Sequence, residues 1–102
     1  RGGQPDGHGT EYFDNVHVKY EGEWRGGQPD GQGTEYHFGT GVRTYEGYFL
    51  KGHRDGKGTE YFDNGNVKYQ GEWKEGFKDG RGTEYHNSTG NKAYEGMFKD
   101  GH

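Results

Sequence analysis

The positions of aromatic and β-branched residues follow a repeated pattern along this chain, and no segment shows a helical period. Each repeat contains two short runs rich in Tyr, Thr, Phe, Trp and Val, separated by turn-forming residues. Such runs predict β-strands joined as a hairpin. One pattern, Asp-Gly-x-Gly-Thr-Glu-Tyr, begins at Asp6, Asp30, Asp55 and Asp79. The second, Tyr-(Glu/Gln)-Gly-x-(Trp/Phe), begins at Tyr20, Tyr45, Tyr69 and Tyr94.

The spacing of the repeat defines the organisation of the chain. The four tyrosines of the second pattern are 25, 24 and 25 residues apart. We therefore predict one repeat domain over residues 1–102, with four hairpin units at about 1–24, 25–49, 50–73 and 74–98. Residues 99–102 resemble the start of a further connector. Stacked in one dimension, the hairpins would form an all-β, elongated, single-layer antiparallel meander.

The turns set the predicted register within each hairpin. Asn64-Gly65 predicts a two-residue type I′ turn, which places Tyr69 opposite Glu60, Gly71 opposite Gly58 and Val67 opposite Phe62. The even units have one extra residue, and a three-residue loop ending at Gly41 or Gly90 preserves the same register. In the first unit Val16 replaces Gly65. If the turn there is also type I′, Val16→Gly is expected to stabilise the protein by about 1 kcal/mol.

Alternation along the strands sorts the side chains onto two faces. One face carries the glycine pairs and two rows of rings, in which the glycines leave a hollow for a neighbouring ring. The opposite face of the third unit carries Thr59, Tyr61, Lys68, Gln70 and Glu72. The eight residues of the two rows are Tyr20, Trp24, Tyr45, Phe49, Tyr69, Trp73, Tyr94 and Phe98. Part of these rings must stack within the molecule. A single-layer sheet has no second layer to cover them all, so we predict that some of the aromatic face stays exposed and contacts a partner.

Composition and charge narrow the functional classes. Only 24% of the residues are hydrophobic, but 17% are aromatic, and large rings bury more area than aliphatic side chains. The net charge of -4 argues against binding nucleic acid and disfavours an anionic membrane. No cysteine is present, which excludes disulfides and thiolate metal sites. No apolar run is long enough for a signal peptide or a membrane helix.

Residue types that often carry chemistry have simpler roles here. Glu11, Glu35, Glu60 and Glu84 recur identically, whereas a catalytic site is usually one asymmetric constellation. One Asp per repeat does not supply the six to eight oxygens of a calcium site, so the Asp-Gly pairs are interpreted as turns. No two histidines have metal-ligand spacing. His37 and His86 are expected to cap the aromatic face near the turns. The remaining histidines are His8, His17, His53 and His102.

The two patterns together resemble the MORN (membrane occupation and recognition nexus) repeat. The residues that carry the resemblance are Tyr20 to Trp24, Tyr45 to Phe49, Tyr69 to Trp73 and Tyr94 to Phe98, with the Gly-x-Gly pairs that begin at Gly7, Gly31, Gly56 and Gly80. The resemblance covers essentially the whole chain. It implies a rod of stacked hairpins and roles in membrane tethering, protein–protein contact or self-association. Aspartate stands here at the position before the first glycine, where the family often has histidine.

We therefore expect a non-catalytic scaffold, without cofactor or metal, that binds a protein partner through the eight aromatic residues. Two alternatives remain open. One is peripheral membrane association through basic residues of the connectors, namely Arg25, Lys51, Arg54, Lys74, Lys78 and Arg81. The other is self-assembly, because the first strand near Thr10 and the last near Tyr94 would be open sheet edges. The expected location is the cytoplasm, with or without membrane association.

Overall fold

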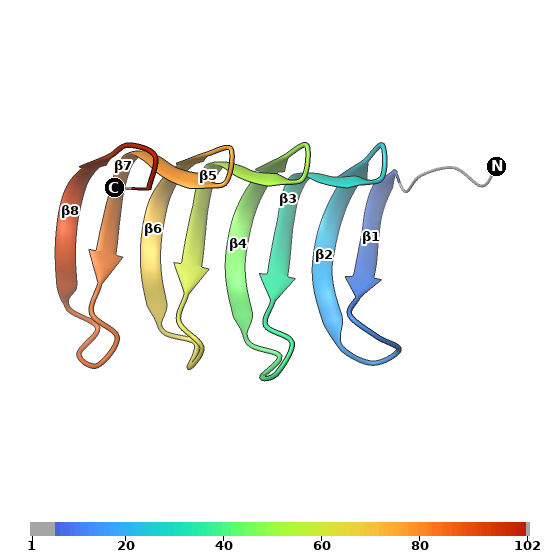
Figure 1. Cartoon of the computed structure of the whole chain (residues 1–102), viewed down its shortest axis with the longest axis horizontal. Helices are drawn as coiled ribbons and strands as arrows, with labels where there is room; N and C mark the ends of the chain where they lie inside the picture. The colour runs from blue at the N-terminus through green and yellow to red at the C-terminus, as the bar shows by residue number, and fades with distance from the viewer. Residues whose placement is uncertain (1–5, 102) are drawn as a thin grey trace.

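The computed structural model describes residues 6–101. Residues 1–5 and His102 lie outside the described part. It contains eight strands in chain order: β1 Gly7–Tyr12, β2 Val18–Arg25, β3 Gln28–Tyr36, β4 Arg43–Leu50, β5 His53–Tyr61, β6 Val67–Lys74, β7 Phe77–Tyr85 and β8 Lys92–Phe98. Every strand pairs antiparallel with the next, giving one sheet of order β1 to β8. The predicted all-β, single-layer meander of hairpins is confirmed (Figure 1).

The predicted register is confirmed in the middle of each hairpin. Tyr69 lies opposite Glu60, and Gly71 lies opposite Gly58. Tyr45 lies opposite Glu35 in the second hairpin in the same way. The register shifts between Glu60 and Tyr61, which places Val67 opposite Tyr61. The predicted pairing of Val67 with Phe62 is therefore wrong, because a β-bulge leaves Lys68 of β6 as an extra residue.

The loop lengths within the hairpins also differ from the prediction. In the third unit Phe62 donates its N–H to the Asn66 carbonyl, and Gly65 donates to the Phe62 carbonyl. The loop is thus three residues long, with Gly65 at φ +94° in the left-handed region that glycine adopts without strain. In the second unit His37 bonds to Val42 and Gly41 bonds back to His37, which closes a four-residue loop.

The first hairpin turn is held by a side chain. Val16 and His17 both donate their N–H groups at 2.8 Å to Oδ1 of Asp14. Val16 is not at positive φ, unlike Gly65. The premise of the predicted gain from Val16→Gly is therefore wrong, because the turn is an aspartate-capped loop and not type I′.

Type I′ turns occur instead between the units. The two-residue turns are Gly26-Gly27, Lys51-Gly52 and Glu75-Gly76, each with both residues at positive φ. They join β2 to β3, β4 to β5 and β6 to β7. Residues predicted as connector, such as Pro29 and Asp30, lie inside the next strand. The strands are consequently longer, and the connectors shorter, than glycine and proline content suggested.

The turns Lys51-Gly52 and Glu75-Gly76 are each fastened to the strand that follows the preceding turn. Asp30 accepts the N–H of Lys51 at 3.2 Å, and Pro29 accepts the N–H of Gly52 at 2.9 Å. Asp55 accepts the N–H of Glu75 at 3.2 Å in the same way. The prediction that these aspartates form turns is therefore wrong, since they lie in strands and hold the turn of the following unit.

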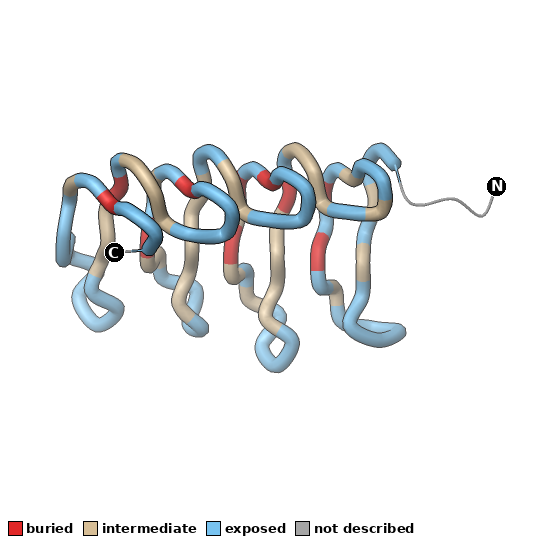
Figure 2. The backbone as a smooth tube through the Cα atoms, turned by 45° about the horizontal axis from the view of Figure 1, so that its top comes forward, coloured by how far each residue is buried: buried red, intermediate tan, exposed pale blue. Residues whose placement is uncertain are grey.

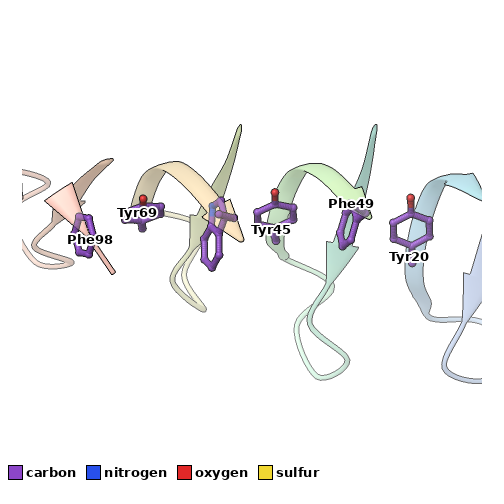
Figure 3. Packing of buried hydrophobic residues seen from close by; sticks show 6 residues of the cluster. Tyr20, Tyr45, Phe49, Tyr69 and Phe98 are labelled. Atoms are coloured by element: carbon purple, nitrogen blue, oxygen red, sulfur yellow. The ribbon is translucent and has the colours of Figure 1, made fainter. Parts of the chain in front are cut away.

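The strands bend around the aromatic rings. The hydroxyl of Tyr45 donates at 2.9 Å to the carbonyl of Tyr48, three residues later in the same strand. An extended strand would place that carbonyl out of reach, so the strand must fold over its own tyrosine. Figure 3 shows the ribbon arching above the rings of Tyr45 and Tyr69. We call the face inside this bend the inner face and the opposite one the outer face.

Candidate functional site

The aromatic residues of the inner face form one continuous zigzag. Tyr45 meets Phe49 of its own strand at 5.1 Å and Trp73 of the next unit at 5.4 Å, both edge to face. This geometry suits the charge distribution of aromatic rings. The same contacts extend the zigzag in both directions, through Trp24, Tyr20, Phe49, Tyr45, Trp73, Tyr69, Phe98 and Tyr94.

Glycine makes room for this packing, as the sequence predicted. A Cβ on Gly58 would overlap the Tyr45 hydroxyl, and a Cβ on Gly33 or Gly82 would overlap the hydroxyl of Tyr20 or Tyr69 in the same way. Each tyrosine thus covers the glycine of the following unit. Trp73 adds a hydrogen bond from Nε1 to the Gly58 carbonyl at 3.2 Å. This bond lies within the third hairpin, whereas the tyrosine–glycine contacts tie neighbouring hairpins together side by side.

Burial corrects the predicted contact surface. Tyr20 is 2% exposed, Tyr45 and Tyr69 are 0% exposed, and Phe49, Trp73 and Phe98 are also buried. Figure 2 shows these buried positions recurring along the tube from unit to unit. Trp24 is partly buried against the same cluster, and Tyr94 is 47% exposed. The prediction of an exposed aromatic face is wrong for the six buried rings, because the bend closes the sheet over them.

Burial also changes the acidity of the tyrosines. Desolvation raises the pKa of Tyr20 to about 12, with a further contribution from the Glu23 carboxylate. It raises the pKa of Tyr69 to about 12, although the hydrogen bond to the Glu72 carbonyl opposes the shift. The pKa of Tyr45 is raised further by burial, despite the nearby Arg54 guanidinium. These phenols therefore remain neutral well above the pH at which a free tyrosine ionises.

Alternating charges accompany the rings on the inner face. Arg54 lies between Glu35 and Glu60, with Nε 3.1 Å from one carboxylate and Nη1 3.3 Å from the other. Lys78 lies between Glu60 and Glu84, at 4.0 Å and 2.7 Å. The recurring glutamates are thus ion-pair partners within the fold. The sequence did not indicate this role, because it assigned Arg54 and Lys78 to solvated connectors.

The outer face contains an open hollow of about 510 Å³ that crosses the sheet from β3 to β8. Its floor is the backbone of the central glycines, Gly47, Gly58, Gly71 and Gly82. Polar residues on the two sides of this glycine line form its walls. Glu46, Thr59, Gln70, Thr83 and Glu95 are on the side of the hairpin loops, and Gln32, Tyr48, Lys57, Glu72 and Arg81 are on the other. We call this feature the outer groove.

Sequence alternation identified some residues of the outer groove but did not predict a groove. It placed Thr59, Gln70 and Glu72 on one face, opposite the rings, and the structure places all three in the groove walls. What the pattern could not show is the bend at the glycines. Bending toward the inner face separates the side chains flanking the glycines on the outer face, and this separation opens the groove.

The basic residues predicted as a lipid-binding stripe do not share one surface. Arg54 and Lys78 lie over rings of the inner face, with the Arg54 Cζ atom 4.6 Å from the Tyr45 ring centre. Arg81 lies in the wall of the outer groove. Arg25, Lys51 and Lys74 lie at the turns between units.

A metal site would need several histidine or carboxylate side chains converging on one point. Among residues 6–101, no group of three or more such side chains is placed to hold a metal ion. His37 and His86 begin the four-residue loops, where their N–H groups bond to Val42 and Asn91. No helix in this range is long and apolar enough to cross a membrane.

Comparison with protein families gives one result. A family model described as MORN repeat matches residues 1–15, 20–43, 45–67 and 69–89, which together make up most of the chain. A comparison with curated proteins gave no match. The last three matched segments begin at Tyr20, Tyr45 and Tyr69, which are the repeated tyrosines of the second strand of each hairpin.

Proposed function

Because this chain belongs to the MORN repeat family, we propose that it is a non-catalytic scaffold that binds a protein partner through the outer groove. The observation that carries this proposal is the groove itself. It is a hollow of about 510 Å³ that crosses five adjacent strand pairs, from β3 to β8, without interruption. This volume lies within the usual range for binding sites, although the groove is open along its length.

The repeat of the groove suggests the form of the partner. Equivalent residues of consecutive units are two strands apart, which corresponds to about 9.6 Å. Three residues of an extended peptide span about 10 Å. An extended segment lying along the groove would therefore meet equivalent wall positions at every third residue. The six strands β3 to β8 span about 24 Å, enough for about seven partner residues.

The walls offer polar groups suited to such a segment. Thr59, Thr83 and Gln70 provide hydroxyl and amide groups, and Tyr48 provides an exposed ring. Lys57 and Arg81 alternate with carboxylates along the walls. Aromatic and charged groups at fixed intervals would select partners by the order of their side chains. They would contribute more to specificity than to affinity, because little apolar surface is buried.

A peptide selection with matched variants tests the proposal. Peptides would be selected from a random library on the immobilised chain, and their affinities then measured in solution. The double variant Thr59→Arg, Thr83→Arg fills the groove, and we expect it to weaken binding by at least about tenfold. Thr10→Arg places the same side chain at the equivalent position of β1, outside the groove, and should leave affinity unchanged. Equal affinities for both variants would refute the groove as the binding surface.

Membrane association has no comparable support. It would need basic residues gathered on one accessible surface. The two most buried of the six predicted residues, Arg54 and Lys78, already pair with Glu35, Glu60 and Glu84. Binding of the unmodified chain to anionic vesicles that is lost in the double variant Lys51→Glu, Lys74→Glu would favour the membrane alternative.

A further inference from the structure

The inner face holds a positively charged side chain at two equivalent positions. At the first, Arg54 bridges Glu35 and Glu60, and its guanidinium lies over the rings of Tyr45 and Trp73 at 4.6 Å and 5.0 Å. Arg54 reaches this position from β5, where it pairs with Phe49 of β4. The guanidinium is thus held by two carboxylates one unit apart.

Lys78 occupies the same position one unit later. Its Nζ is 2.7 Å from Glu84 and 4.0 Å from Glu60, and it lies over the rings of Tyr69 and Phe98 at 5.1 Å and 5.9 Å. Lys78 pairs with Trp73 across the strands, as Arg54 pairs with Phe49. Two different cations thus occupy one repeated arrangement of carboxylates and rings.

The first copy of this arrangement contains no cation of its own. Pro29 pairs with Trp24 at the position of Arg54 and Lys78. The two flanking carboxylates, Glu11 and Glu35, are retained, as are the rings of Tyr20 and Phe49. Proline is uncharged and its short ring cannot bridge two carboxylates one unit apart. Only the cation is missing from this copy.

The exposure of each glutamate side chain agrees with the presence or absence of a neighbouring cation. The Glu60 side chain, with a cation on each side, is 19% exposed. The Glu11 and Glu35 side chains are 42% and 38% exposed. Among residues 6–101, the cation paired with Glu11 is Lys19, whose Nζ is 3.8 Å away on a half-exposed side chain. Such an exposed pair contributes little and is readily exchanged for another partner.

We propose that the position between Glu11 and Glu35 binds a guanidinium or ammonium group from a partner, preferentially the side chain of an arginine. Occupation of the two equivalent positions by Arg54 and Lys78 shows which chemistry this arrangement accepts. A planar guanidinium donates several hydrogen bonds in fixed directions and can bridge two carboxylates, whereas an ammonium group acts as a point charge. Tyr20 is already 2% exposed, so the ligand meets the carboxylates and not the ring face.

This inference concerns the inner face and is independent of the outer groove. A partner that lies in the groove need not reach Glu11, and a cationic side chain can bind between Glu11 and Glu35 without filling the groove. The inner site can therefore fail while the groove binds peptide, or bind while the groove does not.

A peptide titration monitored by nuclear magnetic resonance tests the site with a defined probe. The probe is the peptide acetyl-Gly-Arg-Gly-amide, and the readout is the side-chain carboxyl carbon shift of each glutamate. We expect saturable shifts at Glu11 and Glu35 and much smaller ones at Glu84, which already pairs with Lys78. The same peptide with citrulline in place of arginine has the same shape without the charge and should cause no shift.

Two variants complete the test. Pro29→Arg supplies the missing cation within the chain and should weaken binding of the probe peptide by at least about tenfold. Glu11→Gln removes one of the two carboxylates and should also weaken the probe, which keeps the test valid if Pro29→Arg perturbs the strand. Similar shifts at Glu84, equal shifts with citrulline, or unchanged affinity in both variants would overturn the proposal.

Discussion

At the scale of single residues, the contact between a glycine and the tyrosine of the preceding unit determines how closely two hairpins approach. The Tyr45 ring lies where a Cβ of residue 58 would stand, and the Gly47 Cβ direction points at the backbone of Gly58. Any side chain at these glycines must displace a buried ring or separate two strands. The glycines therefore serve close packing and not flexibility.

Gly58→Ala tests this contact. We expect a loss of about 2 to 3 kcal/mol in the free energy of unfolding, at the upper end of the usual cost of overpacking a core. Gly9→Ala is the matched control, since no tyrosine precedes it and its Cβ would approach Trp24 Nε1 at 3.2 Å. Urea unfolding measures both. Equal losses in the two variants would mean that the tyrosine does not control the spacing of the units.

The buried phenols predict a specific response to alkali. Burial raises the pKa of Tyr20 and Tyr69 to about 12, so the folded state favours their neutral form. Their contribution to stability is complete below the unfolded pKa near 10 and is lost as pH rises toward 12. We expect the free energy of unfolding to fall steeply from pH 10 upward. In Tyr69→Phe this fall should be shallower, and an identical slope would contradict the assigned burial.

The Asp14 loop predicts the opposite response at low pH. Backbone N–H groups of His17 and Val16 lower the pKa of this carboxyl to about 2. A depressed pKa stabilises the folded state above the unfolded pKa of about 4, and this contribution is lost as pH falls toward 2. Asp14→Asn should lower the melting temperature at pH 6 and reduce its decline between pH 4 and pH 2. A parallel decline in both proteins would exclude Asp14 as the cause.

At the scale of secondary-structure elements, the turns show what the sequence could and could not predict. The central register followed from pairing each repeated glycine and tyrosine with its partner, and the structure confirms it. The turn types could not be predicted in the same way. Asn64-Gly65 is the strongest type I′ signal in the chain, yet a bulge at Lys68 shifts the register and its loop is three residues long. Lys51-Gly52 and Glu75-Gly76 form the type I′ turns, because Asp30 and Asp55 hold their first N–H groups.

Glu75→Asn tests this assignment of the turns. Glu75 has φ +52° and Gly76 has φ +90°. Asparagine tolerates the left-handed region better than glutamate, and Asn-Gly is the preferred pair for this turn. We expect thermal unfolding to show a gain of about 1 kcal/mol.

Val16→Gly is the contrasting substitution. Since Val16 is not at positive φ, glycine relieves no strain there and adds freedom to the unfolded chain. We expect it to leave stability unchanged or lower it by about 0.5 to 1 kcal/mol. A gain from Val16→Gly with none from Glu75→Asn would reverse the assignment of the two turn types.

At the scale of the whole molecule, repetition made the rod predictable, and the bend at the glycines was not. Alternation alone describes a flat strand, in which the rings would be exposed. The bend requires the tyrosine hydroxyl to find a carbonyl three residues later, a contact that depends on three-dimensional geometry. For this reason the inner face was predicted as a binding surface, while the outer groove and the paired charges were not.

The two edges of the described sheet, β1 and β8, predict association of the 102-residue chain. Tyr94 is 47% exposed, whereas the corresponding Tyr69 is buried over Gly82. Gly9 occupies the position of Gly82 but has no tyrosine over it. We propose that β8 of one chain pairs with β1 of another, so that Tyr94 covers Gly9, in a head-to-tail contact that continues from chain to chain as an open filament or a closed ring.

Light scattering over a concentration series measures this association. We expect the average mass to rise with concentration, and Tyr94→Ser to reduce the rise. Met97→Ser is the control, because Met97 is also exposed on β8 but on the other face. A strict monomer at high concentration would rule out the head-to-tail contact.

The central claim is that the aromatic zigzag is the packed core of the rod and that partners bind elsewhere. Trp73 tests it most directly, since it lies between two units and is buried, whereas Trp24 is only partly buried. The measurement is urea unfolding of Trp73→Ala, combined with peptide affinity under conditions in which the variant is folded. We predict a loss of about 3 kcal/mol or more, a smaller loss for Trp24→Ala, and unchanged affinity. Unchanged stability with loss of peptide binding would contradict the account and make Trp73 a contact residue.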